Sequence, residues 1–217
     1  MKRFTTPLIA LAAGAAPLLS SHPAQAHGSA ASGVLGGLTH PLLGLDHLLM
    51  LLAVGAAASL LSARLLLWAA VGAIGGAAAA AWGAQLPAAE LLAALAVAAM
   101  GGLTLGVMGE QTRVPRGVAS AEANGTLAVT STLSGLVVAA AVAIHAWLHG
   151  QEAPADGTTL LWWSGVLISS VLVCGGAQQV FKTLPLAITR AAAATFLVLG
   201  GGLALAPLAL LAVGAGG

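Results

Sequence analysis

The chain has 217 residues, of which 59% are hydrophobic and 6% are charged, and its mean hydropathy is +1.00. In water-soluble domains about a quarter of the residues are charged, so this composition excludes that class and predicts an integral protein of the lipid bilayer. The net charge of +1 and the lack of a basic stripe in the sequence exclude nucleic acid as an expected partner.

Residues 1–26 have the pattern of a secretory signal peptide. Two cations near the start precede an apolar run over residues 7–19, and the tripeptide AQA at residues 24–26 fits a small-x-small cleavage site. Cleavage there would make His27 the first residue of the mature chain. The alternative is an uncleaved anchor helix, which Pro17 and the short apolar run disfavour.

Six apolar stretches long enough to cross a bilayer follow the signal peptide, and polar or turn-forming residues separate them. They predict an all-α fold, a polytopic membrane helix bundle with six transmembrane helices in one domain, residues 27–217. The predicted helices cover residues 36–61, 65–84, 88–109, 126–148, 159–177 and 190–214.

The orientation of the bundle follows from its cations, because Lys and Arg are enriched in cytoplasmic loops. If the mature N-terminus is exported, the five Lys and Arg residues beyond the signal peptide all fall on the cytoplasmic side. We therefore expect a membrane protein whose mature N-terminus lies on the side opposite the cytoplasm. The five tryptophans then lie near helix ends, as expected of residues at the membrane interface.

The sequence HPLLGLDH begins at His40 and places ionisable side chains in the first apolar stretch, where they are costly and usually mark functional sites. In a straight helix His40 and His47 would lie about 10.5 Å apart along the axis, too far to bind one metal ion. A helix that begins at Pro41, with His40 folding back as its cap, would close the gap. An irregular turn at Gly44 would also do so. Asp46 could serve as a ligand, supply charge or orient another histidine.

Pairs of glycines four residues apart occur at Gly72 and Gly76 and again at Gly102 and Gly106. In membranes such spacing lets helix backbones approach closely, so the pairs predict a tightly packed bundle.

The sequence HAWLHGQEAP begins at His145, near the end of the fourth predicted helix. His145 and His149 are four residues apart, so they project from one helical face at a distance that suits a shared cation. Gly150 and Pro154 then end the helix, which leaves Glu152 free to turn back toward the histidine pair.

Imidazole together with carboxylate favours a late divalent transition metal over Mg²⁺ or Ca²⁺. The principal candidate ligands are His40, Asp46, His47, His145, His149 and Glu152. The secondary candidates are His27, Glu90 and Met50. The alternative for His27 is an ordinary polar contact, for Glu90 a carboxylate at a helix start and for Met50 a core side chain.

A polar stripe lies on the helix that carries the second motif. Thr130, Ser131 and Ser134 fall within about 60° of the face of His145 and predict a translocation path toward the cytoplasm. The alternative is that these hydroxyl groups bond their own helix backbone or join neighbouring helices.

The two motifs, the AHG start of the mature chain and the LPAAE sequence before the third helix resemble the HupE/UreJ family. The resemblance implies a six-helix membrane protein associated with nickel-enzyme maturation, for hydrogenase or urease, and acting as a nickel permease. It also implies that the six principal candidate ligands matter for metal uptake. The second motif departs from the family pattern, which has a further histidine where this chain has Trp147 and Leu148, and the departure leaves the metal open.

We therefore expect an uptake permease of the bacterial inner membrane, with a periplasmic N-terminus, that carries Ni²⁺, with Co²⁺ as a second cargo. We do not expect an enzyme or a protein with a tightly bound cofactor. The sequence contains no nucleotide-binding loop, so we expect uptake to be passive or driven by the membrane potential, which favours cation entry by about 2.3 kcal/mol per charge per 100 mV. The alternative is that a partner ATPase supplies the energy. The expected partners are the ion and the bilayer, and a homo-oligomer is compatible with the sequence. The alternatives are an intramembrane metal-dependent hydrolase and a non-transporting metal receptor or chaperone.

Overall fold

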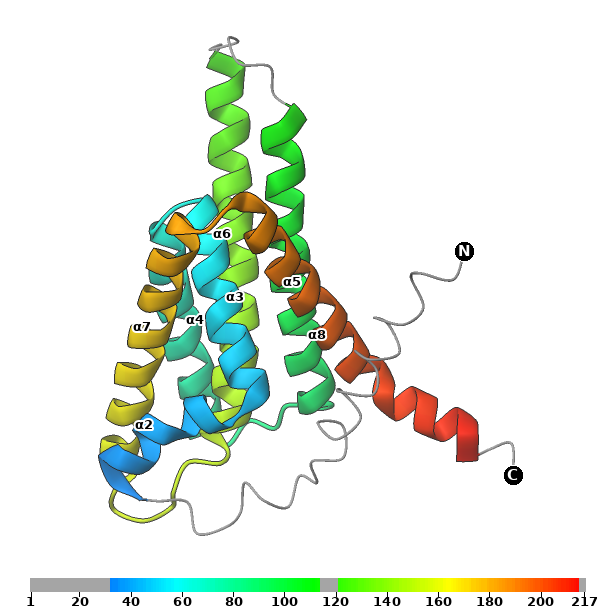
Figure 1. The fold of residues 1–217 in the computed structure, drawn as a ribbon. Coiled ribbons are helices and arrows are strands. Elements are labelled where there is room, and N and C mark those ends of the chain that lie inside the picture. Colours follow the sequence, from blue (N-terminus) through cyan, green and yellow to red (C-terminus); the bar gives the residue numbers. More distant parts are fainter. Residues whose placement is uncertain (1–31, 114–120, 215–217) are drawn as a thin grey trace.

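The computed structural model describes the backbone of residues 32–113 and 121–214 and the side chains of residues 32–109 and 131–205. These ranges contain helices and no strands, which confirms the all-α prediction (Figure 1). The predicted signal peptide and His27 lie outside the described residues. The helices are α2 (Gly33–Leu43), α3 (Leu45–Leu60), α4 (Arg64–Ala81), α5 (Ala89–Arg113), α6 (Ala121–Gly150), α7 (Thr159–Thr183) and α8 (Leu186–Gly214).

The length and composition of these helices are those of a membrane protein. Within the described part of the chain, five helices are long and apolar enough to cross a bilayer, and the bent pair α2–α3 would make a sixth span. Backbone groups in lipid must be bonded within the protein, and a helix bonds them along its own length. The protein is therefore a membrane protein built as a helical bundle.

The predicted helix over residues 36–61 is wrong as a single rod. Helix α2 ends at Leu43, α3 begins at Leu45, and the two axes are bent by 77°. Gly44 lies between them with an extended backbone, φ −78° and ψ 117°. Pro41 lies in the last turn of α2 and does not start a helix, so the irregular turn at Gly44 is the alternative that the structure adopts.

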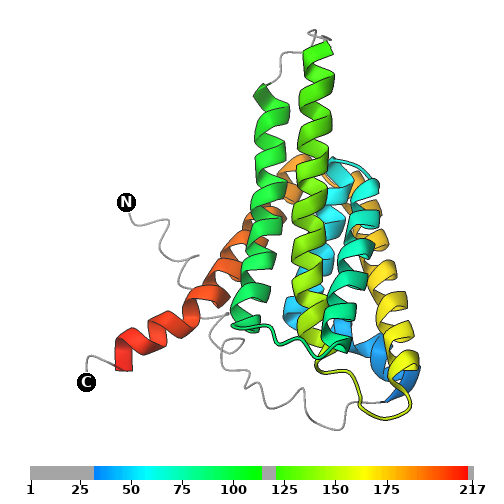
Figure 2. The ribbon, with the colours of Figure 1, turned by 180° about the vertical axis from the view of Figure 1, so that it is seen from behind.

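Two other predicted boundaries are also wrong. The break over residues 178–189 shrinks to a short turn, because α7 continues to Thr183 and α8 begins at Leu186. The loop over residues 110–125 also becomes shorter, since α5 and α6 extend into it. Figure 2 shows α5 and α6 rising beyond the other helices at one end of the bundle, while α8 runs obliquely away from it.

Helix α3 is the centre of the bundle and packs against every other described helix. Its middle turns, from Ala53 to Ala58, are almost completely buried. Around α3, helix α2 packs against α7, α4 against α6 and α5 against α8. The beginning of α3 and the end of α6 lie at the same end of the bundle, which we call the site end (Figure 1).

Close helix contacts depend on glycine, but only one of the two predicted pairs takes part. A Cβ atom on Gly72 or Gly76 of α4 would overlap the backbone of α6 at Ala139 or Ala143, which confirms the prediction for this pair. Gly102 and Gly106 of α5 have nothing within 4 Å of such an atom, so that prediction is wrong. The α5–α8 contact is made instead at Gly101 of α5, which lies against the backbone of α8, and at Gly200 of α8, which lies against the backbone of α5.

We expect Gly76→Ala to lower the free energy of unfolding by about 1–3 kcal/mol, because the added methyl group forces α4 away from α6. The matched variant is Gly75→Ala, the neighbouring residue, where a Cβ meets nothing within 4 Å. There alanine should be neutral or stabilising, since it favours helix more than glycine does. Thermal unfolding in detergent, followed by circular dichroism, compares the two. Equal melting temperatures would contradict the close α4–α6 contact.

Candidate metal centre

Four segments of the chain bring the six principal candidate ligands together at the site end. The last turn of α2 carries one histidine, the first turn of α3 carries the Asp-His pair, the last turns of α6 carry two histidines, and the loop after α6 carries the glutamate. The 77° bend between α2 and α3 folds the first motif back on itself. The residues brought together are His40, Asp46, His47, His145, His149 and Glu152.

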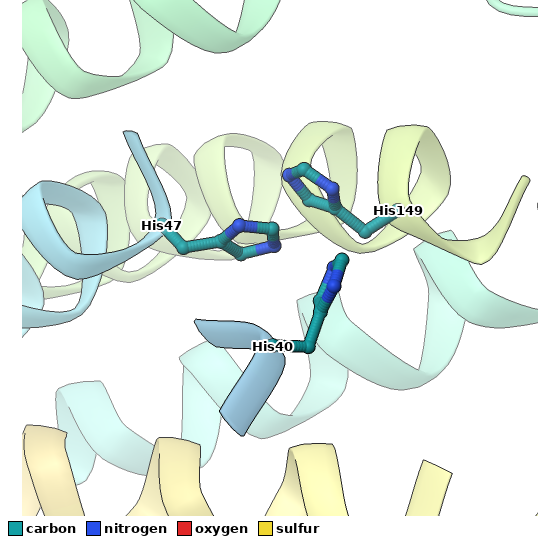
Figure 3. Close-up of side chains that lie close together, drawn as sticks. All are labelled: His40, His47 and His149. Carbon is teal, nitrogen blue, oxygen red and sulfur yellow. The ribbon is translucent and has the colours of Figure 1, made fainter. Parts of the chain in front are cut away.

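The first group of ligands consists of His40, His47 and His149, whose rings converge on a common space (Figure 3). The ring centroids of His40 and His47 are 4.8 Å apart, and those of His47 and His149 are 3.2 Å apart. One nitrogen from each ring lies within 4.8 Å of the others. Three such atoms lie at most about 2.8 Å from a common centre, close to a metal–imidazole bond of about 2.0–2.1 Å. Small side-chain rotations would therefore let this group hold a metal ion.

The second group consists of Asp46, His145 and His149, whose ligand atoms also lie within 4.8 Å of one another. The Oδ2 atom of Asp46 is 3.8 Å from Nε2 of His145 and 3.5 Å from Nε2 of His149. The other carboxylate oxygen of Asp46 is 3.9 Å from Nδ1 of His47. One carboxylate thus faces histidines of both motifs and can supply negative charge to a bound cation.

Glu152 turns back from the loop after α6, as the sequence predicted. Its Oε2 atom accepts a 2.9 Å hydrogen bond from Nδ1 of His149 and lies 3.5 Å from Nε2 of His40. Partial burial alone would raise the pKa of the Glu152 carboxyl, but the hydrogen bond with His149 and the attraction of both histidines hold this pKa below its ordinary value. The ionised carboxylate fixes the His149 ring with Nε2 directed inward, as carboxylates that are hydrogen-bonded to metal-binding histidines do.

Several imidazole nitrogens in this cluster are buried without a hydrogen-bond partner. They are Nε2 of His40, both ring nitrogens of His145 and Nε2 of His149. The side chains of His145 and His149 are only 5% and 9% exposed. Unpaired buried polar groups cost about 1–3 kcal/mol each, and a ligand that binds them removes this cost. The donors suit a cation that accepts imidazole lone pairs.

Helix α2 is held in place by α7, a contact that the sequence analysis missed. Gly37 of α2 packs directly on the backbone carbonyl of Trp162, where a Cβ atom would overlap it. The Trp162 ring lies 4.9 Å from the His40 ring, measured between centroids. Thr158 accepts a 3.1 Å hydrogen bond from the N–H of Gly33 at the start of α2. Trp162 lies in the first turn of α7, near a helix end as predicted, but it is 1% exposed and therefore does not face the lipid.

The secondary candidates lie elsewhere. Glu90 is exposed in the first turn of α5, which fits the alternative of a carboxylate at a helix start. Met50 is buried in the hydrophobic core on α3. His27 lies outside the described residues. Glu90 belongs to neither of the ligand groups that the described side chains form.

The predicted polar stripe on α6 is not a continuous buried path. Ser134 is buried, Ser131 is exposed, and the side chain of Thr130 lies outside the described residues. Between Ser134 and the histidines, the same face of α6 carries Val138 and Ala141, which are buried and apolar. An apolar stretch therefore separates the metal-ligand cluster from Ser134.

Comparison with known proteins identifies the family. The sequence model of the family described as HupE / UreJ protein matches residues 11–210, which is most of the chain. The chain therefore belongs to the HupE/UreJ family, which is associated with nickel and cobalt transport for hydrogenase and urease. Searches of curated proteins and of solved structures found no match.

Proposed function

We propose that this HupE/UreJ protein is an uptake permease of the bacterial inner membrane that carries Ni²⁺, with Co²⁺ as a second cargo, for the maturation of hydrogenase or urease. The observation that carries the proposal is the cluster of buried imidazole nitrogens from α2 and α6 that lack a hydrogen bond and lie beside the carboxylates of Asp46 and Glu152. Such groups are costly at membrane depth unless a partner binds them. A divalent transition metal is the partner that their chemistry favours.

The donor set supports Ni²⁺ and Co²⁺ over a soft ion such as Cu⁺. Imidazole and carboxylate suit divalent transition metals, whereas soft ions prefer sulfur. Among the described side chains, Met50 and Cys174 belong to the hydrophobic core, and the Cys174 sulfur contacts the backbone carbonyl of Leu51. The family association with nickel and cobalt supports the same choice.

The distribution of charge supports uptake from the periplasm. The cationic residues whose side chains are described are Arg64 at the start of α4, Lys182 in the last turn of α7 and Arg190 near the start of α8. These helix ends lie at the end of the bundle opposite the site end (Figure 1). Because cations favour the cytoplasmic side, the ligand cluster would face the periplasm. The membrane potential would then pull a cation inward.

Passage of an ion requires the helices to move. Below the ligand cluster the core is filled by apolar side chains, including Met50, Val54, Val97 and Met100. A permease would alternate between this arrangement and one that opens toward the cytoplasm. A metal receptor or an intramembrane hydrolase would bind the ion without opening, so flux separates the permease from both alternatives.

The test is uptake by liposomes that contain the purified protein. Ni²⁺, Co²⁺, Zn²⁺ and Cu²⁺ uptake would be measured under an imposed potential, negative inside. The proposal predicts saturable Ni²⁺ uptake that rises with the potential and is absent from protein-free liposomes. Tight Ni²⁺ binding without flux would contradict the permease and favour a receptor or a metalloenzyme.

We expect Glu152→Gln to weaken Ni²⁺ binding by about ten- to a hundredfold, because the neutral amide no longer stabilises the hydrogen-bonded His149 ring or the charge of the ion. The matched control is Glu90→Gln, which removes an exposed carboxylate outside the cluster. Equilibrium dialysis with both variants gives the affinities. An unchanged affinity in Glu152→Gln would show that this carboxylate does not support the ion.

Gly44→Ala tests the geometry of the bend without removing a ligand. A Cβ atom at Gly44 would lie 2.7 Å from Nδ1 of His47 and 3.3 Å from Oδ1 of Asp46, so the methyl group displaces both side chains. The backbone at Gly44 has negative φ, which alanine adopts without strain. We expect about tenfold weaker Ni²⁺ binding with unchanged helicity. Gly102→Ala, in open space on α5, should leave the affinity unchanged.

A further inference from the structure

The ligand cluster contains two overlapping groups that share one residue. From this geometry we propose, on the basis of the proposed metal transport, that the protein holds one ion in two successive positions and that His149 transfers it between them. The outer position is formed by His40, His47 and His149, and the inner position by Asp46, His145 and His149.

The five ligands do not form a single site. Among the described residues, the ligand atoms that lie within 4.8 Å of one another fall into these two groups, and only His149 belongs to both. No such group combines His40 with His145. An ion bound by His40 must therefore leave that side chain to reach His145.

The shared histidine also prevents the two positions from being filled together. A neutral imidazole has a lone pair on only one ring nitrogen at a time, so His149 can bind one ion. Two divalent ions would carry four positive charges, whereas the carboxylates of Asp46 and Glu152 provide two negative charges. In apolar surroundings the remaining charge and the repulsion between the ions disfavour double occupancy.

The order of the positions follows from the helices. His149 is in the last turn of α6, and His145 lies four residues earlier, about 6 Å further from the end of the helix. His40 faces Glu152 in the loop beyond α6. The group with His40 is thus nearer the end of the bundle, and the group with His145 is deeper. The inner position also has a carboxylate among its ligands, which strengthens its attraction for a cation.

The experiment titrates the purified full-length mature protein in detergent with Co²⁺, whose visible spectrum reports its ligands. The variants are His40→Gln, which removes an outer ligand, His145→Gln, which removes an inner ligand, and His149→Gln, which affects both positions. Glu90→Gln is the control. Stoichiometry, affinity and spectrum are measured on each protein, and Ni²⁺ flux is measured in liposomes. Size-exclusion chromatography checks folding, and asparagine variants replace any glutamine variant that aggregates.

We expect one Co²⁺ per chain in the wild type and in the His40 and His145 variants. These two variants should bind within about tenfold of the wild-type affinity, because the ion occupies the remaining position, and should lose flux by at least about tenfold. Their two spectra should differ from each other. His149→Gln should weaken Co²⁺ binding by at least about a hundredfold.

Three results would overturn the two-position inference while leaving metal transport intact. They are two Co²⁺ ions per chain, identical spectra in the His40 and His145 variants, and the same loss of binding in all three variants. Wild-type protein that binds neither Co²⁺ nor Ni²⁺ would overturn the proposed function itself, and this inference with it. The two failures are therefore distinguishable.

Discussion

Replacing His149 with alanine is expected to abolish measurable Ni²⁺ uptake and to weaken Ni²⁺ binding by at least about a hundredfold, which corresponds to about 3 kcal/mol. His149 belongs to both ligand groups, so its loss leaves each with two ligands. Its hydrogen bond with Glu152 is lost as well, which leaves that carboxylate without its nearest partner. No other single histidine in the cluster takes part in both groups.

The control for this truncation is Leu133→Ala on the same helix, where the side chain is exposed and lies away from the cluster. Uptake is measured in liposomes at matched protein content, and binding by equilibrium dialysis. The Leu133 variant should retain wild-type uptake. Substantial Ni²⁺ uptake by His149→Ala would place the transport route elsewhere in the bundle.

The second large effect is expected from Asp46→Asn, which keeps the shape of the side chain and removes its charge. The Asp46 carboxylate lies 3.5 Å from His149, 3.8 Å from His145 and 3.9 Å from His47. Asparagine leaves the outer group of His40, His47 and His149 intact, so we expect Ni²⁺ affinity to stay within about tenfold of the wild type. We expect Ni²⁺ uptake to fall by about a hundredfold, because the inner position loses its only anionic ligand.

Glu90→Gln is again the matched control, because it removes an exposed carboxylate at the start of α5. Both variants are compared for initial Ni²⁺ uptake rates over a range of concentrations. If Asp46→Asn lowers uptake no more than Glu90→Gln does, the Asp46 carboxylate does not compensate the charge of the ion.

The second motif could be predicted from the sequence because helical periodicity alone determines its geometry. His145 and His149 are four residues apart, and α6 continues unbroken past both of them. The Gly-Gln-Glu sequence that follows ends the helix and lets Glu152 return to His149, at 2.9 Å. Only local rules of helix geometry and helix termination are needed here.

The first motif could not be resolved in the same way. Its sequence allowed a cap at His40 or a turn at Gly44, and both would bring His40 toward His47. The choice depends on tertiary contacts. Gly37 packs on the Trp162 carbonyl, and the N–H of Gly33 donates a hydrogen bond to Thr158, which is 125 residues away in the sequence. Contacts between residues more than a hundred positions apart leave no periodic signal in the sequence.

Helix packing shows the same limit. Four-residue spacing identified both Gly72–Gly76 and Gly102–Gly106, but only the first pair meets a neighbouring backbone. At the α5–α8 contact the close approach uses Gly101 instead, which lies against the backbone of Leu197. Spacing shows that a helix can be approached closely, whereas the arrangement of its neighbours determines which face is used.

The central claim, that the histidine cluster binds the transported metal, is tested most directly by X-ray absorption at the nickel edge on purified protein loaded with one Ni²⁺ per chain. The account predicts two or three imidazole ligands together with oxygen, no sulfur, and a loss of the imidazole signal in His149→Ala. A nickel shell without imidazole, or one that His149→Ala leaves unchanged, would contradict it.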